Sequence, residues 1–460
     1  MSDEGLRAGI DKMRSEGVAD AAIRAFEHYY RQLEAGETGL MPEDSIEPVT
    51  DLPDFDELPQ DAGAEREALQ HAIVLRLNGG LGTSMGLTRA KSLLEAKDGL
   101  SFLDVIARQV LALRAEHDAR LPLVLMDSFS TRDDSVAALA RYDELDVGLP
   151  LDFLQNKEPK IAVEELVPAE WPDDPALEWC PPGHGDLYTA LVTSGMLERL
   201  LDRGYEHAFV ANSDNLGAVL EPRILAWLRA ERIPFLMEVT DRTEADRKGG
   251  HLAKRREDGR LVLRETAQTP DEDLEALQDI GRHRYVNTNN LWVDLRALDQ
   301  AMRERDGVLG LPMIRNEKTV DPSDKSSPAV YQLETAMGAA IEVFEGARAL
   351  RVPRTRFAPV KTTDDLLALR SDAYRLGDDA RVELVAPQVP LVTLDSDHFK
   401  LLGDFEARFP SGPPSLRDCE RFEVEGDVCF GAGVVARGAV TVRQEGDGQR
   451  VIEDGAVLEG

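Results

Sequence analysis

Four glycines close together carry the clearest chemical signal in this sequence. They lie in the segment Leu77-Asn78-Gly79-Gly80-Leu81-Gly82-Thr83-Ser84-Met85-Gly86, and Lys91 follows shortly afterwards. Glycines let backbone N–H groups approach phosphate oxygens because no side chain intervenes. A nearby lysine adds a mobile positive charge. The segment therefore predicts a phosphate-binding loop, whereas a tight structural turn would explain only one or two of these glycines.

The spacing of the glycines excludes two common nucleotide-binding motifs. The segment lacks the pattern G-x-x-x-x-G-K-[ST] that a P-loop NTPase needs. It also lacks G-x-G-x-x-G, because three residues separate Gly82 from Gly86. A Rossmann dehydrogenase is therefore not expected.

Two further residue settings could complete a phosphate site. Asp214 follows the apolar run Ala208–Ala211, and its carboxylate could bind Mg²⁺, which prefers oxygen ligands. Asn212 and Asn215 flank it, however, and this pattern equally suits an Asx turn. His184 lies between two glycines, so its ring could reach a phosphate or a sugar hydroxyl, or it could be a simple loop residue.

Short apolar runs predict the strands that position these residues. From about residue 70 these runs are Ile73–Leu77, Pro122–Met126, Ala208–Ala211, Phe235–Val239 and Leu261–Leu263. Helical stretches such as Leu103–Arg114 and Ala190–Leu201 lie between several of them. The alternation predicts an α/β fold with a largely parallel sheet that is covered on both faces. Ligands bind such sheets beyond the carboxyl ends of the strands.

The amino-terminal residues have a different pattern. Ile23, Phe26 and Tyr30 recur at three- and four-residue steps with charges between them, which predicts an amphipathic helix within the first forty residues. Residues 41–64 are rich in Pro, Asp and Glu and have no sustained period. We expect a linker or surface segment there rather than a core element.

Near the carboxyl terminus the period changes to six. Phe422, Val428, Val434 and Val440 follow this spacing, and Gly426 lies two residues before Val428. A six-residue period with turn glycines predicts a parallel β-helix. A small antiparallel β domain is the alternative.

Composition limits the class of protein. The 460 residues suggest two or three domains, and the three cysteines allow neither a disulfide framework nor a zinc site. The net charge of −33 argues against a nucleic-acid partner, which would require a basic face. We expect no membrane segment, because no apolar run approaches the ~20 residues that span a bilayer. A cytoplasmic protein is expected, and its acidity would also suit a cytoplasm of high salt.

The segment Leu77–Lys91 resembles the nucleotide-binding loop of the eukaryotic-type UTP–glucose-1-phosphate uridylyltransferases. The resemblance continues in order through Pro122–Phe129, Pro181-Pro182-Gly183-His184-Gly185-Asp186, Asn212-Ser213-Asp214-Asn215-Leu216-Gly217, Met237–Thr240, Lys248-Gly249-Gly250, Asn287–Trp292, Gln332–Ala336 and Pro359-Val360-Lys361-Thr362-Thr363. It covers roughly residues 70 to 460. So many ordered matches are far more specific than a single motif.

The resemblance implies a Rossmann-like, GT-A-like nucleotidyltransferase fold, with a mixed sheet flanked by helices and a C-terminal left-handed parallel β-helix. We expect an N-terminal helical segment and linker over residues 1–64, a catalytic domain over 65–385 and the β-helix domain over 386–460. Some members of the family associate through the β-helix while others are monomeric, so a homo-oligomer formed through this domain is one alternative here.

The implied reaction joins UTP to glucose 1-phosphate with Mg²⁺ and gives UDP-glucose and pyrophosphate. The sugar phosphate is itself an anionic nucleophile, so catalysis consists of alignment and charge neutralisation. A covalent uridylyl-histidine route would need a His-x-His pair, and none of the eight histidines has that spacing. The nearest rival is a UDP-N-acetylhexosamine or broad-specificity UDP-sugar pyrophosphorylase.

The resemblance assigns roles to individual residues. Lys91 and Lys361 are the expected catalytic cations, and Asp214 is the expected Mg²⁺ ligand. The expected nucleotide-binding residues are Leu77, Asn78, Gly79, Gly80, Lys91, Gln155, Gly183, Asn212 and Lys361. The expected substrate-binding residues are His184, Asn212, Gly250, Glu265, Asn287 and Asn289. Amide groups suit both the imide edge of uracil and the hydroxyls of a sugar.

One departure concerns the residues just before the loop lysine. The family has a basic residue, Gly and Pro there, where this chain has Thr88-Arg89-Ala90. Loss of the proline is expected to relax the loop, and Arg89 is expected to supply the charge from a shifted position.

Overall fold

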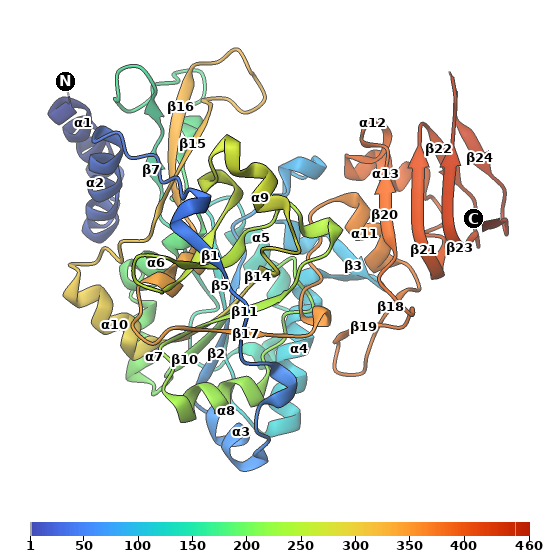
Figure 1. Ribbon diagram of the computed structural model, residues 1–460, viewed down its shortest axis with the longest axis horizontal. Coiled ribbons are helices and arrows are strands. Elements are labelled where there is room, and N and C mark those ends of the chain that lie inside the picture. Colours follow the sequence, from blue (N-terminus) through green and yellow to red (C-terminus); the bar gives the residue numbers. More distant parts are fainter. Residues whose placement is uncertain (1, 447) are drawn as a thin grey trace.

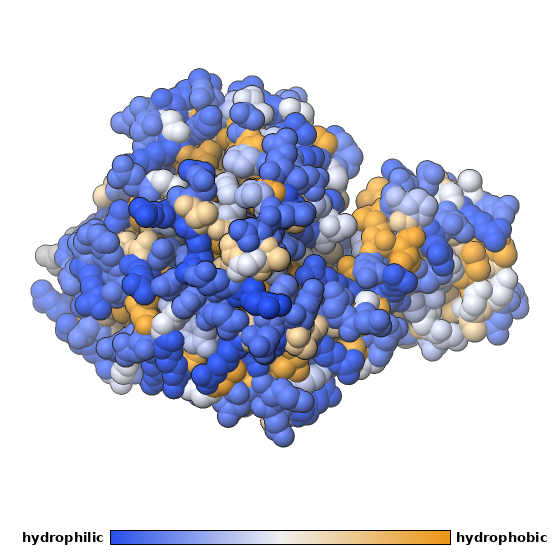
Figure 2. All heavy atoms as spheres, turned by 90° about the horizontal axis from the view of Figure 1, so that it is seen from below, coloured by the Kyte–Doolittle hydropathy of each residue, from blue (hydrophilic) through white to orange (hydrophobic). Residues whose placement is uncertain are grey.

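The computed structural model describes residues 2–446 and 448–460. A large central body carries two N-terminal helices on one side and a smaller C-terminal lobe on the other (Figure 1). Figure 2 shows the same division from another side, with the lobe projecting from a mostly hydrophilic body.

The central body is built around a mixed sheet of ten strands. Its main path is β1 (Ile46–Pro48), β12 (His251–Arg255), β14 (Tyr285–Asp294), β10 (His207–Asn212), β2 (Ala72–Leu77), β5 (Leu123–Asp127) and β6 (Asp152–Leu154). β11 (Phe235–Asp241) pairs with β14 and β17 (Arg348–Arg351), and β13 (Leu261–Arg264) pairs with β12. The path from β10 through β2 and β5 to β6 is parallel, whereas β14 runs antiparallel to β10 and β11. The α/β class is confirmed, and only part of the sheet is parallel.

Alternating side chains place one hydrophobic core on each face of this sheet. Val74 of β2 packs with α3 (Ala62–Leu69), α4 (Phe102–His117) and α8 (Pro222–Glu231). Its neighbours Ile73 and Leu75 pack on the other face with α6 (Leu187–Thr193), α7 (Met196–Asp202) and α10 (Leu295–Glu304). Successive side chains of a strand point to opposite faces, so one apolar run serves both cores.

One of the two predicted helices is divided in the structure. The stretch expected to be helical over Ala190–Leu201 forms α6 and α7, because Gly195 between them has φ 70°. A left-handed residue interrupts the helical hydrogen-bond pattern. α4 matches its prediction and begins at a capping box, in which Ser101 and Asp104 bond each other's backbone N–H.

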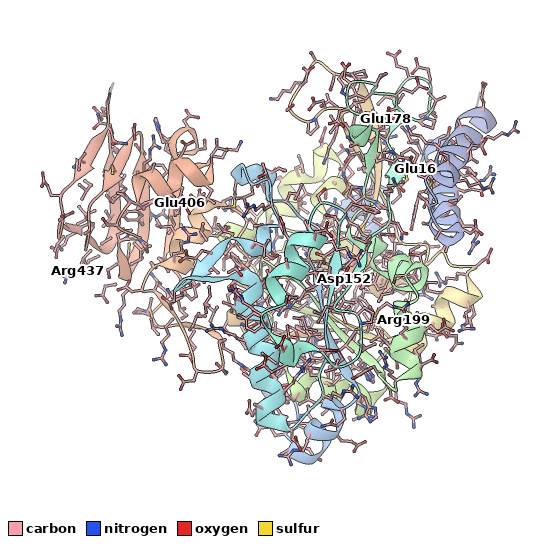
Figure 3. All side chains as sticks on the ribbon, turned by 180° about the vertical axis from the view of Figure 1, so that it is seen from behind. Glu16, Asp152, Glu178, Arg199, Glu406 and Arg437 are labelled. Atoms are coloured by element: carbon pink, nitrogen blue, oxygen red, sulfur yellow. The ribbon has the colours of Figure 1, made fainter. Side chains whose placement is uncertain are left out.

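The N-terminal segment forms α1 (Ser2–Ser15) and α2 (Asp20–Glu34), which pack against β15 (Met313–Thr319) and β16 (Ala329–Thr335). Lys157 donates to Glu16 at 2.9 Å, and Lys12 pairs with Glu178. Figure 3 shows these two carboxylates on the same side of the molecule. The amphipathic helical pattern is confirmed as two helices.

Residues 41–64 differ from the expected linker. Within them Ile46 is buried, and β1 pairs antiparallel with β12 at the edge of the central sheet. Pro48 ends this strand, and proline is tolerated because an edge strand needs fewer backbone donors. A three-residue strand is too short to have a recognisable period in the sequence.

The C-terminal lobe consists of parallel strands. β20 (Leu391–Leu394), β21 (Ser415–Glu425), β23 (Val435–Arg443) and β25 (Val457–Glu459) form one sheet, and β22 (Val428–Phe430) pairs with β24 (Arg450–Ile452). Phe422 lies opposite Val440, as the six-residue period requires for stacked coils. The parallel pairing confirms the predicted architecture over the antiparallel alternative. The hand of the coil and the two boundaries between the three domains stay predictions.

The remaining elements connect these parts. They are α5 (Arg132–Leu139), α9 (Leu274–Gln278), α11 (Thr363–Arg370), α12 (Ser396–Phe399), α13 (Leu402–Arg408), β3 (Glu95–Lys97), β4 (Leu100–Ser101), β7 (Glu158–Pro159), β8 (Ile161–Ala162), β9 (Trp179–Cys180), β18 (Tyr374–Leu376) and β19 (Val382–Leu384). In the part of the chain that the structure describes, no helix combines the length and apolar character needed to cross a membrane.

Candidate active site

The carboxyl ends of β2 and β10 bring the glycine-rich loop and Asp214 together. Leu77 and Asn212 are paired in the parallel ladder, so the segments that follow them leave the sheet side by side. Ser213 N–H donates to the Leu77 carbonyl at 3.2 Å. Val360 N–H donates to the Asp214 carbonyl at 3.1 Å, which brings the segment with Lys361 to the same edge. Residues far apart in the sequence thus meet where ligands bind to such sheets.

Lys91 and Asp214 form an ion pair at this edge. Lys91 Nζ lies 2.8 Å from Asp214 Oδ2, and the two side chains are 17% and 23% exposed. Lys91 N–H also donates to the Gly80 carbonyl at 3.0 Å, so the lysine is anchored to the glycine-rich loop. The pair joins a cation suited to phosphates with a carboxylate suited to a metal.

The second oxygen of Asp214 is suited to a cation. Asp214 Oδ1 is buried and has no hydrogen-bond partner among the described residues. Nor do the described residues contain a cluster of three or more His, Cys, Asp and Glu side chains that could enclose a metal ion. One carboxylate without a surrounding cage fits Mg²⁺, which is usually held by one or two carboxylates together with waters and substrate phosphates.

The glycine-rich loop presents its backbone as expected. Gly82 and Gly86 have φ values of 68° and 74° and bracket a turn at Thr83–Met85. Nothing lies within 4 Å of a Cβ built on Gly80, so this side of the loop is open. A Cβ on Gly79 would lie 3.1 Å from Gln155 Oε1, which places the expected uracil-binding amide directly beside the loop.

The side chain of Asn78 points away from the loop. Its Nδ2 donates to Asp127 Oδ1 at 2.7 Å and to Ser135 Oγ at 2.8 Å, and the residue is buried. Burial raises the pKa of Asp127 to about 6, while the bonds from Asn78 and Thr131 oppose this shift. Asn78 is therefore placed to offer a ligand its backbone rather than its amide.

His184 is held as a neutral imidazole with a defined tautomer. Its Nδ1 accepts a hydrogen bond of 2.9 Å from Met337 N–H, so the ring proton resides on Nε2. Burial lowers the pKa of His184 to about 4. Gly183 has φ 78°, and a Cβ there would lie 2.7 Å from the Thr335 carbonyl oxygen. This close approach leaves no room for a side chain at Gly183 and so fixes the loop that carries His184.

The four expected sugar-binding residues also lie together. A Cβ on Gly250 would lie 2.4 Å from Glu265 Oε2, so the glycine leaves room for this carboxylate. Asn287 N–H donates to the Gly250 carbonyl at 3.1 Å, and Asn287 Nδ2 donates to Asn289 Oδ1 at 2.8 Å. Burial raises the pKa of Glu265, and the charge of nearby Lys361 lowers it. Lys361 therefore lies between the Asp214 edge and the sugar-binding residues.

Ala90 occupies the position of the missing loop proline. Its φ of −53° and ψ of 126° are values that proline itself adopts, and the side chain is buried. The bond from Lys91 N–H and the turn that begins at Lys91 hold the backbone of Ala90 in this conformation. The relaxation of the loop stays a prediction. Arg89 is exposed.

Sequence reasoning missed three buried charges beneath the site. Arg76, Glu238 and Arg356 are 1%, 0% and 7% exposed. The sequence does mark two of them, because Arg76 and Glu238 each interrupt an otherwise apolar strand. A charge within a buried strand is retained only where a partner compensates it.

Comparisons with known proteins agree with this geometry. A family model for UTP–glucose-1-phosphate uridylyltransferase matches residues 23–437. The UTP–glucose-1-phosphate uridylyltransferase of Hordeum vulgare is 39% identical over 467 residues, covering 99% of this chain and 95% of the relative. That of Solanum tuberosum is 41% identical and covers 87% of this chain and 83% of its own length.

Solved structures give the same result. The UDP-glucose pyrophosphorylase of Leishmania major is 48% identical with a TM-score of 0.93, covering 99% of this chain and 98% of that chain. A variant of that enzyme in complex with UDP-glucose has a TM-score of 0.92 at the same 48% identity and the same coverage of both chains. The UDP-glucose phosphorylase of Trypanosoma brucei is 44% identical with a TM-score of 0.92, again covering 99% and 98%. The chain therefore belongs to the UTP–glucose-1-phosphate uridylyltransferase family.

Proposed function

We propose that the protein forms UDP-glucose by direct attack of glucose 1-phosphate on the α-phosphorus of UTP. Production of UDP-glucose from UTP and glucose 1-phosphate is the activity of this nucleotidyltransferase family, to which the chain is similar over nearly its whole length. The observation that carries the mechanism is the meeting of Lys91, Asp214 and the Lys361 segment at one sheet edge. An oxygen of the sugar phosphate bonds to the α-phosphorus, and pyrophosphate leaves with the electron pair of the broken bond.

The lysines neutralise charge during this transfer. In this proposal Lys91 contacts the leaving phosphates, and the bond of its backbone to the glycine-rich loop supports that role. Lys361 contacts the phosphates of the sugar and the nucleotide in this proposal, which its position near both the Asp214 segment and Glu265 supports. Such fixed charges stabilise a transition state without reorganising during the reaction. His184 adds a neutral donor, Nε2–H, for a phosphate or sugar hydroxyl.

The binding roles follow the two halves of the site. The backbone of Leu77–Gly80, with Gln155, Gly183 and Asn212, would bind the base and ribose. Gly250, Glu265, Asn287 and Asn289, with His184 and Asn212, would bind the sugar and its phosphate. Clustered amides and one carboxylate suit a ligand whose hydroxyls both donate and accept.

Mg²⁺ is part of the proposal, with Asp214 as its protein ligand. When bound, it would draw negative charge from the α-phosphate of UTP and help to orient it. The unpartnered Asp214 Oδ1 supports this role. Lys91 would exchange its carboxylate partner for phosphate oxygens when nucleotide binds.

Pyrophosphate release tests the activity and the choice of sugar. The protein is supplied with UTP and with glucose 1-phosphate, N-acetylglucosamine 1-phosphate or galactose 1-phosphate, with and without Mg²⁺. We expect Mg²⁺-dependent turnover that favours glucose 1-phosphate about tenfold or more. Preference for N-acetylglucosamine 1-phosphate would assign the chain to the UDP-N-acetylhexosamine rival, and equal rates would assign a broad-specificity enzyme.

Asp214→Asn tests the metal site itself. Loss of the carboxylate charge should lower kcat about 100-fold or more, while the protein stays folded. Asp173→Asn is the matched control, because it removes the same charge from an exposed residue that is not one of the proposed site residues. Equal kcat in the two variants would contradict the proposed role of Asp214.

Two further features belong to the proposal. Val451 and Val457 are 62% and 52% exposed on the last strands of the C-terminal lobe, which supports a homo-oligomer formed through this domain. Sedimentation of the protein and of Val451→Asp would reveal the association, since a charge at the contact should lower the mass. A cytoplasmic location stays a prediction.

A further inference from the structure

A buried ion pair between Glu238 and Arg356 lies beneath the candidate active site. Arg356 Nε donates to Glu238 Oε2 at 2.8 Å, and Arg356 Nη2 donates to Glu238 Oε1 at 2.6 Å. Both residues are buried. This two-point contact fixes the direction of the guanidinium as well as its distance from the carboxylate.

Additional donors complete the coordination of Glu238. Trp292 Nε1–H donates to Oε1 at 2.9 Å, and Asn290 Nδ2–H donates to Oε2 at 3.0 Å. Burial alone lowers the pKa of Arg356, but the charge and hydrogen bonds of Glu238 outweigh it and raise the pKa overall. The pair is therefore charged and fully compensated, which is the condition for retaining ions in a protein interior.

Two asparagines extend this contact to the site. Asn290 Nδ2 also donates to the Arg356 carbonyl, and Asn290 Oδ1 accepts from Asn215 Nδ2, both at 3.2 Å. Asn215 Nδ2 donates to the Arg356 carbonyl at 3.2 Å, and Asn215 Oδ1 accepts from Ala358 N–H at 3.0 Å. Asn215 adjoins Asp214, and Ala358 lies just before Lys361. One network therefore joins β14, the Asp214 loop and the Lys361 segment.

Arg76 supports the same loop from the neighbouring strand β2. Its guanidinium donates to the carbonyls of Asn212 at 3.2 Å and Asn215 at 3.4 Å, and it also contacts the Ala218 carbonyl. Burial and, to a smaller extent, the positive charge of Arg356 lower the pKa of Arg76, while Asp214 raises it, and the net result is a pKa of about 9. The loop that carries Asp214 is thus held by buried side chains on two sides.

We propose that Glu238 and Arg356, acting through Asn290 and Asn215, are positioning residues that set the spacing between Asp214 and Lys361. The inference rests on the proposed function, in which these two side chains act on the same phosphates. None of the four residues needs to touch substrate. Misplacement of reacting groups by about 1 Å can lower the rate about 100-fold. Loss of the network should therefore reduce kcat more than it changes KM.

The main test replaces both charges together. Glu238→Gln combined with Arg356→Met leaves no unpaired buried charge and keeps an amide oxygen as the acceptor for Trp292 Nε1–H, while Asn290 Nδ2 keeps the Arg356 carbonyl. We expect an unchanged Tm within a few degrees, a kcat about 10- to 100-fold lower and KM values for UTP and glucose 1-phosphate within about threefold. A kcat equal to that of the unchanged protein would overturn the proposal.

Asn215→Asp breaks the link without disturbing the ion pair. The variant keeps the acceptor for Ala358 N–H but loses both amide donations from Nδ2. Hydrogen exchange measured by mass spectrometry should become faster in peptides covering residues 212–218 and 356–362, while peptides of β5 stay unchanged. This measurement needs no turnover, so it separates the positioning network from the proposed reaction. Unchanged exchange rates in both segments would overturn the proposed positioning network. If instead the protein without substitutions shows no turnover, only the proposed reaction is contradicted.

Arg114→Met controls for loss of stability alone. Arg114 Nε donates to the Leu121 carbonyl at 2.6 Å. Leu121 precedes β5, so this contact lies at the amino ends of the parallel strands, whereas the candidate site lies at their carboxyl ends. We expect a lower Tm with kcat unchanged for the folded fraction. The fall in kcat for each degree of Tm lost is then compared between this variant and the double variant. If the two values are equal, the Glu238–Arg356 pair serves stability alone and the proposal fails.

Discussion

At the scale of single residues, His184 shows how the backbone sets the chemistry of a binding group. Met337 N–H donates a hydrogen bond to Nδ1 of His184, and burial lowers the pKa of the imidazole from 6.5 to about 4. The ring is therefore a hydrogen-bond donor through Nε2 at neutral pH, and it does not act as a cation. This assignment makes His184 a neutral complement to the charges of Lys91 and Lys361.

The depressed pKa of His184 predicts how stability depends on pH. Between pH 6.5 and pH 4 the unfolded chain binds a proton on this residue that the folded protein does not bind. The stability contributed by neutral His184 is therefore fully present above pH 6.5 and is lost as pH falls towards 4. Relative to His184→Asn, which keeps an acceptor for Met337 N–H but does not titrate, the protein should lose up to about 3 kcal/mol over this range.

Urea unfolding at several pH values measures this difference. The free energies of unfolding of the two proteins are compared at pH 7, 5.5 and 4.5. Other groups titrate in both proteins, so their effects cancel in the comparison. A difference that stays constant across the range would show that His184 does not have a depressed pKa.

At the scale of elements, the glycine-rich loop depends on two different properties of glycine. Gly82 has φ 68°, and a Cβ there would lie 2.8 Å from Leu87 Cδ1 and 3.3 Å from Lys91 Cγ. Gly99, in the turn between β3 and β4, has φ 74° with nothing within 4 Å. Both positions need a left-handed backbone, but only the first also needs empty space beside Lys91.

Substituting alanine at Gly82 and at Gly99 separates the need for a left-handed backbone from the need for empty space. Gly82→Ala and Gly99→Ala should each lower the free energy of unfolding by about 1–2 kcal/mol, because a Cβ is disfavoured at these φ values. Only Gly82→Ala should also raise KM for UTP, since the new methyl group displaces Lys91. Thermal unfolding and steady-state kinetics of both variants check this. An equal rise in KM for Gly99→Ala would point to general loosening of the fold.

At the scale of the whole molecule, the net charge of −33 opposes the binding of anionic substrates. In the proposed mechanism, local lysines and backbone N–H groups must therefore attract UTP against the overall field of the protein. Salt screens long-range charge first, because the Debye length falls from about 30 Å at 0.01 M to about 8 Å at 0.15 M. The proposed short contact between Lys91 and a bound phosphate would be screened far less.

This balance predicts that kcat/KM for UTP rises with moderate salt. Between about 0.01 and 0.2 M KCl we expect an increase of about two- to fivefold, because screening weakens the global repulsion before it weakens the local attraction. Sucrose at equal osmolality is the control, since it leaves charge interactions unscreened. A steady fall in kcat/KM over this range would show that the local cations dominate at all distances.

The reaction class and the order of the main elements could be inferred from the sequence alone. The apolar runs mark β2, β5, β10, β11 and β13, and the six-residue period marks the C-terminal parallel strands. The glycine-rich loop and Asp214 could also be placed at strand ends. These signals are local, because periodicity and turn glycines act within a few residues along the chain.

The rest depended on contacts between distant parts of the chain. The antiparallel position of β14 and the pairing of β1 with β12 depend on which edges meet, and no local pattern encodes that. Likewise, Glu238 and Arg356 are separated by 118 positions, and Met337 sets the tautomer of His184 from 153 positions away. A buried charge or a neutral imidazole is stable only beside its partner, so the three-dimensional packing decides both. The sequence by itself determined the chemistry available to this protein, and the tertiary structure decided how that chemistry is held in place.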